Sequence, residues 1–219
     1  EWLAPDTHAL WKTELLAGMV DGAFASSIGA LMGSIHAGTA NDDQLRRRFA
    51  TDSAFNTLRI KPYFEATAQK HPELACVLRS IAKRTTSTKQ VLVHGDVSPK
   101  NILKGPAGPV LLDAEVAWFG DPAFDLAFCI NHLVIKSRVV TGASNILSAA
   151  IAALAGAYFA RVTWEDVEAI EERTAALLPA LALARVDGMS PVEYLTHDQQ
   201  QGLRSAAAQV LVKPSLSVA

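Results

Sequence analysis

Asp96, Asn101 and Asp113 are the residues of this 219-residue chain whose types and spacing most directly indicate chemistry. The amide oxygen of Asn101 and the carboxylate of Asp113 could share a Mg²⁺ ion, which prefers hard oxygen ligands. Asp96 would then remain to orient and deprotonate an attacking hydroxyl group. Phosphoryl transfer needs little more from a protein than such positioning and charge neutralisation.

Short strands must hold these residues in place. The Gly- and Pro-rich segment 105–109 predicts a turn, and antiparallel pairing across it would return Asp113 to the neighbourhood of Asn101. The polar residues would therefore lie at the strand ends of one β-hairpin. The apolar runs of strand length are residues 91–93, 102–104 and 110–112.

The motif H-G-D-x-x-x-x-N resembles the catalytic loop of the aminoglycoside phosphotransferase family, a small-molecule branch of the protein-kinase-like fold. Here it comprises His94, Gly95, Asp96 and Asn101. Protein kinases have H-R-D in this loop with the same spacing from Asp to Asn, and Gly95 replaces their Arg. Two further blocks follow in the family's order, and three linked motifs are much more specific than one His-x-Asp. They are the D-x-E of residues 113–115 and the G-D-P-x-x-D-L-A of residues 120–127.

The resemblance implies ATP as the phosphoryl donor and Mg²⁺ as the metal. It assigns Asp96 as the catalytic base, and Asn101 and Asp113 as the residues that hold Mg²⁺ on the nucleotide. Glu115 is a further candidate metal ligand, which could instead act through a water molecule or brace the loop. Lys100 is a second catalytic candidate, which could contact the γ-phosphate or be a solvated loop lysine.

Three residues are expected to support the site structurally. Asp121, directly before Pro122, predicts a helix cap. By the resemblance, Asp125 inside that helix would accept hydrogen bonds from the backbone of the catalytic loop. His94 would pack beneath the same loop.

The chain resembles the helical carboxy-terminal lobe of a protein-kinase-like α+β fold. Glu1 and Leu3 resemble the end of the interlobe hinge, whose backbone would meet the adenine of ATP. No G-x-G-x-x-G loop and no five-strand pattern is visible, so we expect the amino-terminal β lobe to be absent and the chain to be a fragment. The predicted organisation is one lobe, residues 1–219, with a hinge at 1–4, the catalytic and metal-binding hairpin at 91–115 and carboxy-terminal helices at 116–219.

Outside the hairpin the pattern predicts helices, so the expected fold class is mainly α with a small β-hairpin. Asp6 would cap the first helix, and Pro62 and Pro72 would separate later ones. Capping boxes at Ser190 and Thr196 predict the starts of the last two. The predicted helices are 6–16, 22–36, 41–48, 51–59, 62–70, 72–84, 122–136, 144–160, 164–185, 191–195 and 197–212.

Bulk properties exclude several classes of protein. A net charge of −2 provides no basic footprint for nucleic acid, and the longest apolar run, residues 146–160, is short for a membrane span. Cys76 and Cys129 lack C-x-x-C spacing and are expected to be buried free thiols, although two cysteines also allow one disulfide. With no signal-peptide pattern, these features predict a cytoplasmic location. The sequence does not indicate an oligomeric state.

The predicted substrate is a small-molecule hydroxyl compound of open identity. A polycationic aminoglycoside would need carboxylates, and a quaternary amine such as choline would fit aromatic rings, but solvated helix faces and core packing account for the same residues. The acidic candidates are Glu165, Asp166, Glu168, Glu171, Glu172, Asp187 and Asp198, and the aromatic ones are Trp118, Tyr158, Trp164 and Tyr194.

Two other functions stay open. A noncatalytic binding lobe would explain the missing amino-terminal lobe, although the complete set of Asp96, Asn101 and Asp113 opposes it. A Mg²⁺- or Zn²⁺-dependent hydrolase would use His94, Asp96 and Asp113 as ligands, but only one histidine belongs to that cluster.

Overall fold

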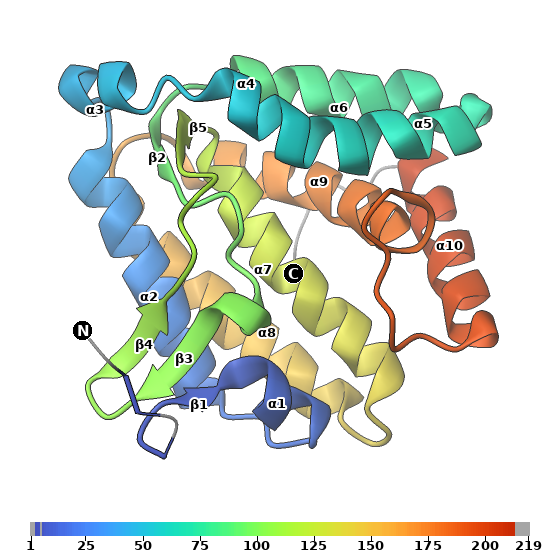
Figure 1. The fold of residues 1–219 in the computed structure, drawn as a ribbon, viewed down its shortest axis with the longest axis horizontal. Helices are drawn as coiled ribbons and strands as arrows, with labels where there is room; N and C mark the ends of the chain where they lie inside the picture. Colours follow the sequence, from blue (N-terminus) through green and yellow to red (C-terminus); the bar gives the residue numbers. More distant parts are fainter. Residues whose placement is uncertain (1–2, 5, 213–219) are drawn as a thin grey trace.

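The computed structural model describes residues 3–4 and 6–212 and shows a mainly helical molecule with two small antiparallel sheets (Figure 1). In the larger sheet, β3 (Ile102–Gly105) and β4 (Gly108–Leu111) form a hairpin. Ile102 pairs with Leu111 and Gly105 with Gly108, so the hairpin predicted from the apolar runs and the Gly-Pro turn is confirmed. The smaller sheet pairs β2 (Val91–Val93) with β5 (Trp118–Gly120).

The helix predicted over residues 6–16 is wrong in its first half. Ala9–Leu10 form β1, which pairs with Lys104 and Leu103 on the free edge of β3. Helix α1 therefore covers only Trp11–Leu16, and its N-cap residue, Leu10, makes no side-chain capping bond. The backbone of residues 9 and 10 therefore forms its hydrogen bonds with β3, a strand far away in the sequence, and not within a helix.

Three long helices pack together, and two of them contact the strands (Figure 1). Helix α2 begins after Asp21, whose carboxylate accepts a hydrogen bond from Phe24 N at 3.0 Å, and it buries a stripe that includes Ile28. Its backbone lies very close to α8, because a Cβ on Gly29 would collide with the Leu154 carbonyl oxygen. The three helices are α2 (Gly22–Thr39), α7 (Pro122–Val139) and α8 (Ser144–Phe159).

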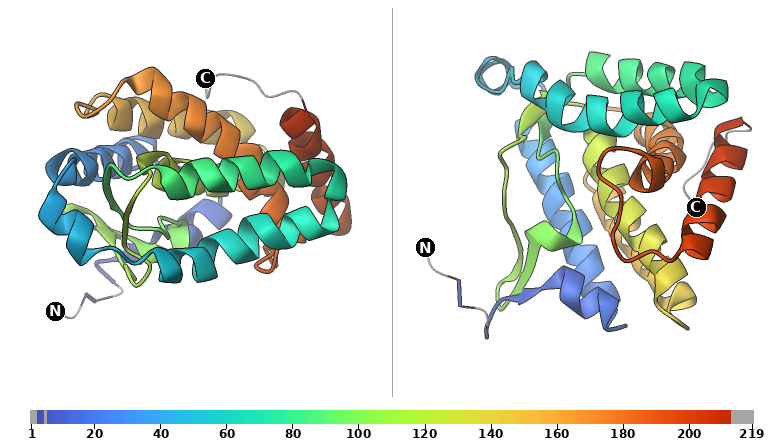
Figure 2. Two further views of the ribbon diagram at one scale, coloured as in Figure 1. Left: turned by 90° about the horizontal axis from the view of Figure 1, so that it is seen from above. Right: turned by 45° about the vertical axis from the view of Figure 1, so that its right-hand side comes forward.

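Pro62 does not end a helix, contrary to the prediction. It lies within η1, a π-helix, and the wider π turn accommodates a ring that in an α-helix would clash with the carbonyl four residues earlier. Pro72 does mark a break. Figures 1 and 2 show the resulting continuous helix beside α6 across one end of the molecule. The segments are α4 (Asp52–Phe55), η1 (Asn56–Glu65), α5 (Ala66–Lys70), η2 (Pro72–Leu74) and α6 (Ala75–Ser87).

One of the two predicted capping boxes is present. Thr196 N donates to Gln199 Oε1 at 2.9 Å and Gln199 N donates to Thr196 Oγ1 at 3.3 Å, so this box is confirmed. The helix predicted at 191–195 is wrong, because Val192 N donates to Arg185 O at 2.9 Å and this segment turns back onto the preceding helix. The remaining helices are α3 (Asp43–Arg48), η3 (Pro99–Asn101), α9 (Val167–Asp187) and α10 (His197–Val212).

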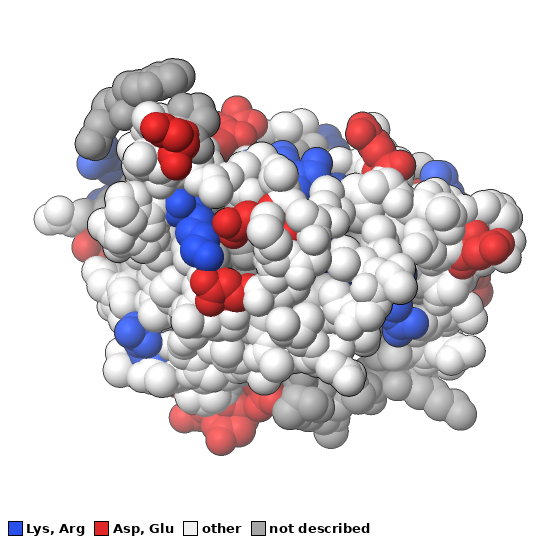
Figure 3. Space-filling view, turned by 90° about the horizontal axis from the view of Figure 1, so that it is seen from below, with Lys and Arg blue, Asp and Glu red and all other residues white. Residues whose placement is uncertain are grey.

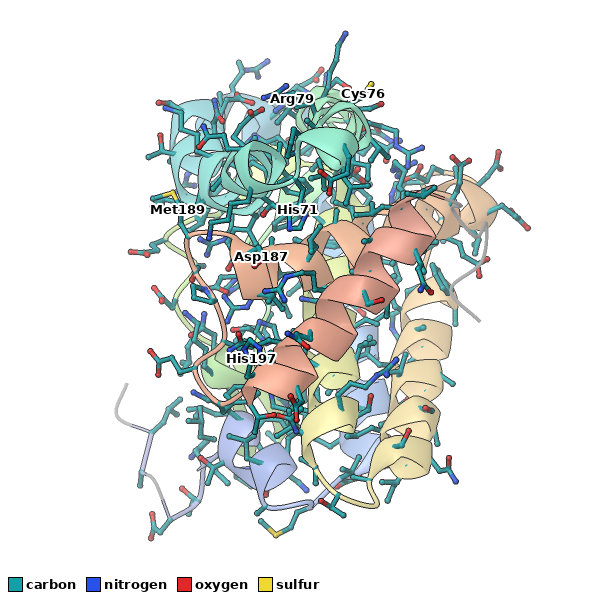
Figure 4. All side chains as sticks on the ribbon, turned by 90° about the vertical axis from the view of Figure 1, so that its right-hand side faces the viewer. His71, Cys76, Arg79, Asp187, Met189 and His197 are labelled. Carbon is teal, nitrogen blue, oxygen red and sulfur yellow. The ribbon has the colours of Figure 1, made fainter. Side chains whose placement is uncertain are left out.

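Buried apolar side chains from both sheets and most helices form one connected core. Cys129 lies within it as a free thiol, but Cys76 is exposed on α6, so its predicted burial is wrong (Figure 4). The outer face of an amphipathic helix explains the difference, because neighbouring Leu78 takes the buried position. Among the described residues, no helix is both long and apolar enough to cross a membrane.

Candidate active site

The catalytic loop, residues 94–101, follows buried strand β2 and is anchored by Asp125 of α7. The Asp125 carboxylate accepts hydrogen bonds from His94 N at 2.7 Å and Gly95 N at 2.9 Å, which are the contacts that the resemblance implied. Gly95 has a φ of 80°, and a Cβ there would lie 2.9 Å from the Val116 carbonyl oxygen. The turn therefore favours glycine and fixes the backbone just before Asp96.

Asp125 is a buried charge with enough partners to remain ionised. Burial acts to raise its pKa, but the hydrogen bond with His36 Nε2 at 3.4 Å and the hydrogen bonds from the loop N–H groups hold the pKa below its usual value. The ionised form can accept both backbone hydrogen bonds at once. The anchor of the loop is thus electrostatic as well as geometric.

Asp96 is the central acidic side chain of the site. It is 6% exposed, and its Oδ2 lies 3.1 Å from both Arg59 Nη2 and Lys100 Nζ. Asn101 Nδ2 donates to the Asp96 carbonyl oxygen at 3.2 Å, which ties the two predicted residues together. Both cations approach Oδ2 most closely, so Oδ1 is the atom left to meet a ligand.

Arg59 belongs to the site and was missed from the sequence. Besides its ion pair with Asp96, its Nε donates to Gly95 O at 2.5 Å, and its guanidinium lies 5.8 Å from the centre of the Phe128 ring. It comes from the π-helix η1, far from the catalytic loop in the chain. No motif indicates such a contact, since only tertiary packing brings the two segments together.

Asn101 and Asp113 both lie at the open end of the hairpin. Leu112 N donates to Asn101 O at 2.9 Å, so the residue that follows, Asp113, leaves the strand beside Asn101. Asp113 has a φ of 63° and is exposed, as is Glu115. In the described part of the chain neither carboxylate makes a hydrogen bond or ion pair, so both are available to a ligand.

These residues fit the implied Mg²⁺. Since Asn101 donates through Nδ2, its Oδ1 remains an available oxygen, and Asp113 adds a carboxylate. Magnesium commonly takes one or two protein carboxylates and completes its shell with water and phosphate. Within the described residues no group of three or more His, Cys, Asp or Glu is arranged to hold a metal ion, so the zinc hydrolase alternative gains no support.

Asp121 caps α7, as predicted, and also joins a buried ion network. Its Oδ1 accepts hydrogen bonds from Ala123 N and from Arg173 Nε, both at 3.0 Å. Burial raises the pKa of Asp121, and Arg173 opposes that effect. Arg173 Nη2 also donates to Glu165 at 2.8 Å, so Glu165, a candidate for contacting an aminoglycoside, is already paired.

His94 is half-buried at the start of the catalytic loop. Its Nδ1 accepts a hydrogen bond from Asp96 N at 3.2 Å. Its Nε2 is buried without a partner in the described structure, beside a cavity of about 220 Å³. Glu1 lies outside the described residues and Leu3 is half-buried ahead of β1, so their contact with adenine stays a prediction.

Asp96 opens onto a cavity of about 580 Å³ at the junction of α1, η1, α7 and α9. None of the seven acidic residues considered for an aminoglycoside lines it, and of the four aromatic candidates only Tyr194 does. Asp187, for example, binds His71 Nε2 at 2.9 Å and Arg204 Nε at 2.7 Å; Figure 4 shows His71 and Asp187 close together. The charged residues that line the cavity are therefore not among these acidic candidates.

Residues 10–170 match the family model described as the phosphotransferase enzyme family, APH, which covers most of the chain. The chain therefore belongs to the aminoglycoside phosphotransferase family. No curated protein gives a significant match. The matched range contains the catalytic loop and the hairpin, but it ends near the start of α9, before the cavity-lining residues Arg185, Met189 and Tyr194.

Proposed function

We propose that the protein transfers the γ-phosphoryl group of ATP to a hydroxyl group of a small molecule bound in the cavity beside Asp96. The observation that carries this proposal is the Asp96 carboxylate, which is fixed within the catalytic loop and faces the cavity. Family membership supports a phosphotransferase reaction. A volume of about 580 Å³ suits a small molecule.

The residues divide the work as follows. Asp96 Oδ1 accepts the hydroxyl proton while the new bond from the hydroxyl oxygen to phosphorus forms and the bond to the ADP oxygen breaks. Arg59 positions Asp96, and Lys100 places a positive charge near the transferred group. Bound Mg²⁺ would neutralise phosphate charge, and Asn101 and Asp113 are the residues that would hold it.

Glu115, Glu1 and Leu3 complete the proposed nucleotide side. The exposed Glu115 carboxylate, two residues after Asp113, would contact the metal directly or through water. The backbone of Glu1 and Leu3 would meet the adenine. His94, Asp121 and Asp125 support the loop without contacting the reacting groups.

The test is a product analysis of the protein expressed from its complete reading frame. With Mg·ATP and a panel of small alcohols, we expect mass spectrometry to detect an alcohol that gains one phosphoryl group, with matching release of ADP. The Asp96→Asn variant should lose this product, whereas Asp43→Asn, which changes an exposed carboxylate on α3, should retain it. ATP turnover without a phosphorylated alcohol would contradict the proposal.

A cytoplasmic location is consistent with free Cys76 and Cys129, since disulfides persist mainly in oxidising compartments. On the face drawn in Figure 3, Lys and Arg side chains and Asp and Glu side chains lie in small separate groups. That surface lacks the broad basic area expected of a nucleic-acid-binding face. Nucleotide and small-molecule alcohol are therefore the proposed partners.

A further inference from the structure

The cavity beside Asp96 is strongly basic. The chain as a whole has a net charge of −2, so this concentration of positive charge does not follow from composition. Asp96 is the one acidic residue in its described lining. The basic lining residues are Lys12, Arg59, Lys61, Lys100, Lys136 and Arg185.

Lys136 is the least expected of these cations, because it lies inside α7 and is only 1% exposed. Its Nζ is 3.4 Å from the Tyr194 hydroxyl and 5.4 Å from the centre of that ring, and no described carboxylate pairs with it. Burial, with the nearby charge of Lys12, lowers the pKa of Lys136 to about 8. Burying an ammonium group without a counter-ion is costly, and such groups cluster at functional sites.

Arg185 is a second cation without an acidic partner. Its Nη1 donates to the Tyr63 hydroxyl at 3.2 Å and to the Ser190 carbonyl at 2.5 Å, while its buried Nε has no partner in the described structure. These neutral oxygens fix the position of the guanidinium without cancelling its charge. The residue is therefore held ready for an anion.

Lys12 on α1 and Lys61 on η1 add further positive charge to the lining of the cavity. Neither makes an ion pair within the described residues, whereas Arg59 and Lys100 are already paired with Asp96. The cavity therefore has two charge environments. Next to Asp96 its single carboxylate offsets part of the charge of Arg59 and Lys100, whereas no described carboxylate pairs with Lys12, Lys136 or Arg185.

We propose that the cavity binds a hydroxylated small molecule that carries an anionic group, a carboxylate or a phosphate, on Lys136 and Arg185 while its hydroxyl lies at Asp96. This inference rests on the proposed phosphotransferase function and specifies its substrate class. It excludes polycationic aminoglycosides and choline as preferred substrates, because their charges would face like charges. Met189, which is 73% exposed at the rim, and Phe128 provide an apolar wall for the carbon skeleton.

The test compares ligands that differ mainly in charge. Isothermal titration at low ionic strength measures binding of glycerate and glycerol 3-phosphate, which separate the carboxylate from the phosphate, and of glycerol, choline and kanamycin. The variants are Lys136→Met, Arg185→Met and, as a matched control, Lys70→Met, which removes an exposed lysine outside the cavity. Phosphorylation by Mg·ATP is measured with each ligand in parallel.

We expect at least one anion to bind more tightly than glycerol, choline and kanamycin. Lys136→Met and Arg185→Met should each weaken that binding by about tenfold or more, since each removes a charged hydrogen-bond donor to the anion. Lys70→Met should leave it unchanged. Lys136→Met also removes a buried charge, so a thermal melt should show that this variant folds.

The outcomes separate the two proposals. If choline or kanamycin binds best, or if neither anion binds, or if Lys136→Met and Arg185→Met leave anion affinity unchanged, the inferred substrate class is wrong. Phosphorylation of a neutral or cationic alcohol would then still support the phosphotransferase function. Anion binding that depends on Lys136 without phosphorylation of any anionic alcohol would support the anion site and count against the proposed reaction.

Discussion

The two sides of Asp96 differ in charge, exposure and origin. On the hairpin side, Asp113 and Glu115 are exposed carboxylates close to Asn101 in the chain. On the cavity side, buried Lys136 and other cations come from helices that are far apart in the chain. One side suits a metal cation and the other an anionic group.

This difference indicates how the site is specified. The hairpin side lies within a short segment that carries the family motifs, and the family match covers it completely. The cavity takes Arg185, Met189 and Tyr194 from beyond that match. We infer that the reaction class depends on the short local segment, whereas substrate selection depends on the packing of distant helices.

The largest effect is expected from substitution of Asp96, which should change the rate of phosphoryl transfer much more than the affinity for the substrate. Asp96→Asn should lower the rate of phosphoryl transfer by about 10²- to 10⁴-fold, because the amide cannot accept the hydroxyl proton. Binding of glycerate or glycerol 3-phosphate should change much less, since Lys136 and Arg185 remain. Steady-state kinetics and titration on the same preparation would measure both. An unchanged rate would remove Asp96 from the role of base.

A change on the hairpin side should leave the cavity unaffected. Asp113→Ala should weaken Mg·ATP binding by about 10- to 100-fold or more, judging from the cost of disturbing partners of metal ligands. Anion affinity measured without nucleotide should stay the same. Glu115→Ala is the matched comparison: a loss as large as that of Asp113→Ala would indicate direct ligation, and a smaller loss would indicate action through water. Normal Mg·ATP affinity in Asp113→Ala would contradict the metal assignment.

The local sequence was sufficient to predict features in which residues a few positions apart form hydrogen bonds with one another. The β3–β4 hairpin, the Asp121 cap and the box of Thr196 and Gln199 were all predictable, because each depends on residues a few positions apart. The same holds for the motif residues of the catalytic loop. Their proximity follows from one turn and one hairpin.

Features that depend on distant partners were not predictable. Ala9–Leu10 became a strand through pairing with β3, and residues 191–195 folded back onto Arg185. The Arg59 contact with Asp96 and the burial of Lys136 have the same cause. A single sequence shows which residues are charged but not which helices bring them together, so the acidic residues considered for the substrate lie elsewhere.

The pH dependence of anion binding would sharpen the contrast on the cavity side. The pKa of Lys136 is lowered to about 8, so the ammonium is charged below that pH and is progressively neutralised above it. Glycerate affinity should therefore fall by about tenfold between roughly pH 7 and pH 9.5, since its own carboxylate stays ionised throughout. Titrations across this range would measure the change.

Three titratable groups near Lys136 have pKa values that are shifted away from that window. Burial raises the pKa of Cys129 to about 12 and raises that of Tyr194, while burial lowers the pKa of His132 well below its usual value. Lys12 and Arg185 are the other cations whose charge acts on Lys136. Lys136→Met should bind glycerate weakly with a flat profile, and an equally steep decline in that variant would assign the dependence to another group.

The smallest effect is expected at Asp187, which braces the end of α9 two residues after Arg185. The pKa of Asp187 is lowered, chiefly by the hydrogen bond from Arg204 and also by the hydrogen bond with His71. The ionised carboxylate therefore stabilises the fold at pH values above the pKa that Asp187 has in the unfolded chain. This stabilisation is lost as the pH falls through the lower pKa of the folded protein. Asp187→Asn should lower the free energy of unfolding at pH 7 by about 1 kcal/mol. Urea unfolding should show this difference shrinking below about pH 4. Asp198→Asn, a change of an exposed acid on α10, should be nearly neutral, and an equal loss there would indicate a general charge effect instead of a specific brace.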